Sequence, residues 1–185
     1  HIRTRTIHPT KTYSELQMQL ETFTEDISTA PLIYHDAKRL QAETDQIHQL
    51  HEAALNELFD KTWVTPIWTE SEAQEAANIL QSVLIAPNDL AVMVSAITLS
   101  LLRVFDVKKL SFLMEAYKHE DAQVNQRAIV GIIITITKYE KRVAMYSDIV
   151  SRLSLLNEEE DFQKNLHTIQ MQLLITRETS KIDKK

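Results

Sequence analysis

The side chains best suited to chemistry in this sequence are two histidines three residues apart, His48 and His51. On a helix, residues at this spacing face the same side, so the two imidazoles could hold a metal ion together with His35 or Glu52. Zinc hydrolases, however, combine glutamate and histidine in the orders His-Glu-x-x-His or His-x-x-Glu-His, and the sequence has neither. A solvated polar helix face is therefore the preferred interpretation. The alternative is a helical enzyme or metal-binding protein that uses the His48 and His51 face.

Other residue types that support catalysis lack a suitable setting. The acidic run from Glu158 to Asp161 could supply paired carboxylates, but it stands where a helix is expected to begin, and negative charge suits a helix N-terminus. Serine, histidine and aspartate are scattered, without the strand-turn-helix context of a catalytic triad. There is one glycine, Gly131, and no cysteine, which excludes phosphate-binding loops, dinucleotide fingerprints and thiolate chemistry. We expect no enzyme activity, no catalytic or metal-binding residue and no cofactor.

Charge and hydropathy narrow the class of partner. The chain of 185 residues has 20 Lys and Arg against 26 Asp and Glu, a net charge of −6, so we expect no nucleic acid partner. The longest apolar candidate, Leu90 to Phe105, is interrupted by polar residues, so we expect no membrane insertion and a soluble chain, with the cytoplasm as the default compartment. Because the sequence begins at His1, without an initiating methionine, we expect a piece of a larger protein.

A repeated pattern indicates how the chain is organised. The nine-residue motif Asp-x-x-Val-x-x-x-Ala-Ile begins at Asp89 and again at Asp121, 32 residues later. A fainter copy begins at Asp161 and shares the final isoleucine of the motif, Ile169. Helical spacing repeated at such an interval is typical of stacked helical repeats.

Apolar periodicity and capping residues predict a series of helices. Asp89, Asp106 and Asp121 are expected N-caps, and Thr69 with Glu72 forms a capping-box pattern. Thr29 and Pro31 are expected to break the first helix. The expected helices span residues 12–26, 32–59, 69–86, 89–105, 106–117, 121–138 and 141–156, and a last one begins near 157.

The segment Thr62 to Trp68 concentrates both tryptophans around Pro66, and we interpret it as a junction held by buried aromatic rings. The predicted regions are an N-terminal helical region (1–61), the junction (62–68), a repeat region (69–176) and a charged tail (177–185).

One segment favours a strand by its composition. The run from Ile129 to Thr137 is almost wholly β-branched, which is typical of strands. Its alignment with the preceding repeat and the cap at Asp121 predict a buried helix instead, because packing overrides weak propensity. An edge strand in an otherwise helical domain is the alternative.

The repeat motif resembles that of the HEAT-repeat family, whose second helices commonly open with aspartate, valine and alanine at this spacing. The resemblance covers about residues 69–176; Met93 and Asn125 stand where the family often has arginine, and Arg127 is the nearest substitute. It implies an all-α fold in which an N-terminal helical pair precedes three antiparallel helical hairpins, stacked as a short right-handed α-solenoid. Tetratricopeptide arrays have a similar period, but their characteristic Trp, Gly, Tyr and Pro positions are not matched.

The same resemblance implies a scaffold or interaction module whose second helices line a concave face. If the motif's valine and alanine face the core, the residues three and six positions after the valine turn away from it. This register predicts a face for a protein or peptide partner, or for another domain of the same chain. Its expected members are Ser95, Thr98, Arg127, Val130, His167 and Gln170.

Overall fold

The computed structural model describes residues 10–182, and within this span it contains eight α-helices and no strand. This confirms the predicted all-α class, including the helical form of the β-branched run from Ile129 to Thr137. The helices are α1 (Tyr13–Ile33), α2 (Ala37–Val64), α3 (Glu70–Gln81), α4 (Pro87–Arg103), α5 (Val107–Ala116), α6 (Ala122–Val143), α7 (Ser147–Asn157) and α8 (Glu160–Ile182).

Several helix starts follow from side chains that cap the first turn. Thr69 and Glu72 form the predicted capping box at α3, and Thr12 and Glu15 form another at α1. Asp106 accepts a hydrogen bond from the backbone N–H of Lys108 at 3.0 Å and caps α5. Asp121 likewise caps α6 by accepting from two backbone N–H groups. These caps satisfy donors that have no partner within the helix.

The predicted break at Thr29 and Pro31 is wrong, because α1 continues to Ile33 with Pro31 inside its last turn. Pro31 has no N–H to donate, but the backbone N–H of Tyr34 still donates to the carbonyl of Ala30 at 3.0 Å and closes the last turn. The chain turns after Tyr34, and α2 begins at Ala37 with Asp36 as its N-cap, five residues later than expected.

The predicted cap at Asp89 is also wrong. Pro87 occupies the first position of α4, where a missing N–H costs nothing, so the helix begins two residues earlier with Ala86 as N-cap. The carboxylate of Asp89 instead lies 2.8 Å from Nε2 of His51 on α2. The preceding helix, α3, ends at Gln81 and not near residue 86.

The expected helix end near Lys138 coincides with a kink in α6 at Tyr139, whose φ of −121° and ψ of 30° depart from helical values. The Tyr139 ring packs on Phe105, with centroids 5.4 Å apart. The expected start of the next helix near Lys141 is wrong, because a short helical segment continues α6 from the kink to Val143 and α7 begins only at Ser147.

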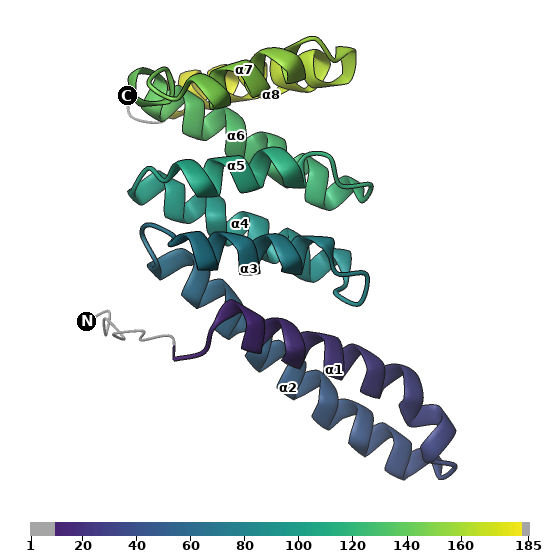
Figure 1. Cartoon of the computed structure of the whole chain (residues 1–185). Helices are drawn as coiled ribbons and strands as arrows, with labels where there is room; N and C mark the ends of the chain where they lie inside the picture. Colours follow the sequence, from purple (N-terminus) through teal and green to yellow (C-terminus); the bar gives the residue numbers. More distant parts are fainter. Residues whose placement is uncertain (1–9, 183–185) are drawn as a thin grey trace, which may run out of the picture.

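The helices pack in two rows (Figure 1). In one row α2 packs on α4, α4 on α6, and α6 on α8; in the other α1 packs on α3 and α3 on α5. Buried side chains form one continuous cluster from Tyr13 in α1 to Phe162 in α8. Near its N-terminal end, the ring of Trp68 meets Tyr13 and Phe112 edge-on, with centroids 5.7 Å and 5.8 Å apart. Trp68, which follows Pro66 by two residues, thus lies between Tyr13 of α1 and Phe112 of α5.

The single glycine, Gly131, lies where α6 packs against α4. A Cβ atom added to Gly131 would lie 2.3 Å from Oγ1 of Thr98 on α4 and 2.9 Å from Cδ1 of Leu113 on α5. Only a residue without a side chain fits at this point. Gly131 therefore fixes how closely α6 lies against α4, and thus the shape of the surface between them.

Candidate interaction groove

A groove of about 510 Å³ lies on the surface shared by α4, α6 and α8. Four of the six residues predicted for the partner-binding face line it: Ser95 and Thr98 from α4, and Arg127 and Val130 from α6. The structure thus brings together the predicted residues of the first two motif copies.

The two predicted residues on α8 are placed differently. His167 is exposed and does not line the groove, and the side chain of Gln170 lies outside the described residues. The lining residues of α8 are Asn165, Thr168, Ile169 and Gln172. Their spacing of three, four and seven residues marks one face of a helix, whereas His167 is two positions from Asn165 and points elsewhere. The face of α8 that lines the groove is therefore not the one that the faint third copy of the motif predicted.

The floor of the groove is apolar and its rim is polar. Leu99 and Val130 keep 41% and 36% of their surface exposed, and Ile169 lies beside them. On the rim, Arg127 donates from Nη1 to Oγ of Ser95 at 2.8 Å, which ties α6 to α4. The amides of Gln126 and Asn165 also line the groove, and each can both donate and accept hydrogen bonds. Sequence reasoning missed Leu99, although its spacing of four residues from Ser95 could have identified it.

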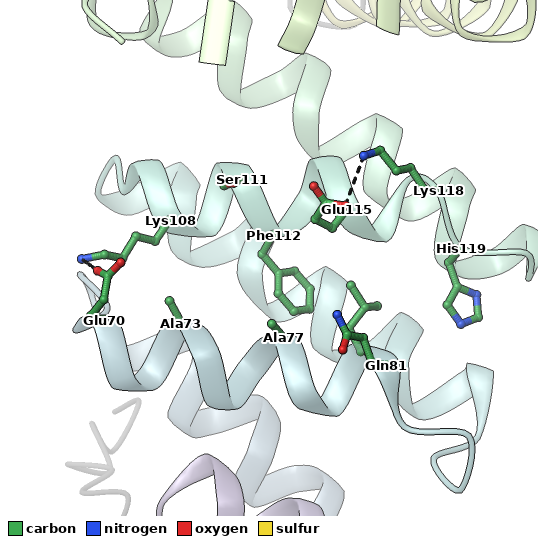
Figure 2. A pocket seen from close by; sticks show the side chains of 11 residues that line it. Glu70, Ala73, Ala77, Gln81, Lys108, Ser111, Phe112, Glu115, Lys118 and His119 are labelled. Carbon is green, nitrogen blue, oxygen red and sulfur yellow. Dashed lines mark hydrogen bonds and ion pairs between the residues drawn. The ribbon is translucent and has the colours of Figure 1, made fainter. Parts of the chain in front are cut away.

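A second groove, of about 460 Å³, lies between α3 and α5 (Figure 2). The ring of Phe112 and the methyl groups of Ala73 and Ala77 form its apolar centre. Its charged rim is already paired: Lys108 lies 2.9 Å from Glu70, and Lys118 lies 3.2 Å from Glu115. The hydrogen bond to Glu70 raises the pKa of Lys108 above its ordinary value.

A polar cluster lies inside the protein at the end of α2. The side chain of Lys109 on α5 is fully buried, and its Nζ donates to the carbonyls of Thr62 and Thr65 and to Oγ of Ser100. Burial lowers the pKa of Lys109 to about 8, while the nearby carboxylates of Asp106 and Glu72 oppose this shift. Because the buried ammonium group donates to three oxygens of the protein itself, Lys109 joins α5 to α4 and to the end of α2.

The histidine pair does not converge on one point. His51 lies against Asp89, whereas His48 is exposed on α2. Among the described residues, no group of three or more His, Cys, Asp or Glu side chains is arranged to hold a metal ion.

No family model matches the chain, and comparisons with curated proteins and with solved structures give no significant match. Within the part of the chain that the structure describes, none of the helices is both long and apolar enough to cross a membrane.

Proposed function

We propose that this chain is a short right-handed α-solenoid of HEAT-like helical hairpins that binds a protein or peptide segment without catalysing a reaction. The packing of α2, α4, α6 and α8 in succession supports the solenoid arrangement. The partner binds in the groove between α4, α6 and α8.

The observation that carries the proposal is the exposure of Leu99 and Val130 on neighbouring helices at the floor of that groove. An apolar floor with a polar rim is the usual anatomy of a binding surface. The α3–α5 groove is the weaker candidate because its rim charges are paired within the protein.

The types of lining residue favour binding over chemistry. Apart from aliphatic side chains, the groove contains hydroxyls, amides and one guanidinium. None of the residues recorded along the groove is a histidine or a carboxylate, the groups that most often transfer protons in catalysis. Amides and hydroxyls are suited to the backbone of a peptide, which presents donors and acceptors in alternation.

Selection from a library of random 12-residue peptides, followed by affinity measurement, tests the proposal. Val130→Glu places a charge on the groove floor and is expected to lower the affinity for the selected peptides more than tenfold. Val83→Glu is the matched control, because Val83 is 96% exposed on the turn before α4 and does not line the groove. Binders that tolerate Val130→Glu and Val83→Glu equally would overturn the proposal.

A further inference from the structure

The charge of the α4–α6–α8 groove differs from that of the whole chain. The chain has a net charge of −6, yet the only charged residue recorded along the groove is Arg127. Among the described residues Arg127 has no carboxylate partner, and its hydrogen bond goes to the neutral hydroxyl of Ser95. A guanidinium has five donors in a fixed fork that matches a carboxylate, so most of its binding capacity remains open.

A second cation lies further along the same pair of helices, beyond the residues that line the groove. Lys138 of α6 donates from Nζ to the carbonyl of Leu102, which lies three residues beyond Leu99 on α4. Lys138 also has no carboxylate partner within the described residues. An ammonium has three donors, so one hydrogen bond to a carbonyl leaves its charge free to attract an anion.

The hydrogen-bond partners of the two cations lie on α4, about two turns apart. Arg127 is anchored on Ser95 and Lys138 on Leu102, seven residues further along α4. At a rise of 1.5 Å per residue this is about 10 Å. A peptide in the polyproline II conformation advances about 3.1 Å per residue with three residues per turn, so side chains three residues apart lie on the same face and nearly match this distance. The apolar floor formed by Leu99 and Val130 lies along this stretch.

We propose that the groove, together with the surface between it and Lys138, binds an acidic peptide segment in the polyproline II conformation, in which an apolar side chain lies between two carboxylates three residues apart. One carboxylate pairs with Arg127 and the other with Lys138, while the apolar side chain covers Leu99 and Val130. This partner chemistry rests on the proposed function of the groove. A basic segment would find no carboxylate among the recorded groove residues, and a nucleic acid would meet too few cations on a chain of net charge −6.

Synthetic 12-residue peptides test this assignment by fluorescence anisotropy. The probe has a Glu-Ser-Leu-Glu core flanked by serine and glycine; one matched peptide has lysine for both glutamates and another has serine for leucine. The lysine peptide is expected to bind at least tenfold more weakly. Raising the salt concentration from 0.1 M to 1 M shortens the Debye length from about 10 Å to about 3 Å. It is therefore also expected to weaken the binding of the probe.

Two variants locate the contacts. Arg127→Gln and Lys138→Gln are each expected to lower the affinity for the acidic probe about fivefold. This is the effect of losing roughly 1 kcal/mol per ion pair. Lys38→Gln is the matched control, since Lys38 is exposed at the start of α2 and lies outside the groove. Equal binding of the acidic and basic peptides, or loss with Lys38→Gln alone, would overturn the inference. If library-selected peptides of another composition still depend on Val130, the proposed function stands and only the acidic partner fails.

Discussion

The ammonium group of Lys109 lies 5.2 Å from the centroid of the Trp68 ring, within the protein interior. Its hydrogen-bond acceptors include the carbonyl of Thr62, in the last turn of α2, and that of Thr65, the residue after the helix ends. The C-terminal end of a helix carries partial negative charge and unpaired carbonyls. Lys109 of α5 therefore supplies a positive charge and hydrogen-bond donors to the end of α2, although the two are far apart in sequence. Trp68, whose Nε1 donates to the hydroxyl of Tyr13 at 2.8 Å, links the same point to α1. This contact sets how α1 and α2 join the helices that form the groove.

Lys109→Met is expected to destabilise the protein by about 2 kcal/mol, because it leaves buried acceptors without a donor while relieving part of the cost of burying a charge. Urea denaturation followed by circular dichroism measures the change. Lys118→Met, which removes an exposed lysine after α5, is the control and is expected to change stability by less than about 0.5 kcal/mol. Equal stabilities for the two variants would show that the Lys109 hydrogen bonds contribute nothing.

The stability of the protein is expected to rise between pH 8 and pH 10. Burial lowers the pKa of Lys109 to about 8 from an ordinary value of 10.5, so in this interval the unfolded chain binds more protons than the folded one. Stability then increases with pH, by at most about 1.4 kcal/mol per unit for one group. Burial raises the pKa of Tyr13 from 10.0 to about 12, which acts in the opposite direction above pH 10. The difference in unfolding free energy between wild type and Lys109→Met, measured from pH 7.5 to pH 9.5, isolates the lysine. A difference that stays constant with pH would contradict the expectation.

The features that could be predicted from sequence are those with a local cause. Asp106, Asp121 and the Thr69–Glu72 pair were predicted as caps because the hydrogen bonds they make lie within one helical turn. Local propensity predicted breaks at Pro31 and after Lys138, and the structure has only the second of them, as the kink at Tyr139. Asp89 had the sequence context of a cap, but its partner is His51, 38 residues away.

The residues of the groove also divide into those with a local sequence signal and those without one. Ser95, Thr98, Arg127 and Val130 were predicted because two clear motif copies place them in equivalent positions on α4 and α6. The face of α8 was missed because it depends on how that helix rotates against α6, which a faint motif copy does not determine. Lys109 had no signal at all, since a lysine on an amphipathic helix is normally exposed and its nearest backbone acceptor is 44 residues away.

Gly131→Ala is expected to destabilise the protein by about 1 to 3 kcal/mol, the usual cost of overpacking, despite the higher helix propensity of alanine. The added methyl group would collide with Oγ1 of Thr98, 2.3 Å away. The double variant Thr98→Ala with Gly131→Ala removes that oxygen and is expected to recover part of the loss, which a double-mutant cycle in urea would measure. Additive effects of the two substitutions would show that the contact does not limit how closely α6 approaches α4.

His51 and His48 are expected to respond differently to substitution, although both lie on α2. His51→Ala leaves the buried carboxylate of Asp89 without its partner at 2.8 Å and is expected to cost about 1 to 2 kcal/mol. His48→Ala changes an exposed side chain and is expected to cost less than about 0.5 kcal/mol. Thermal melts with added zinc or with a chelator distinguish this structural role from metal binding, because an ion held only by the folded state would raise the melting temperature. We expect neither addition to shift it. A zinc-dependent rise that both histidine variants abolish would instead support the metal-binding alternative, in which the two imidazoles act together.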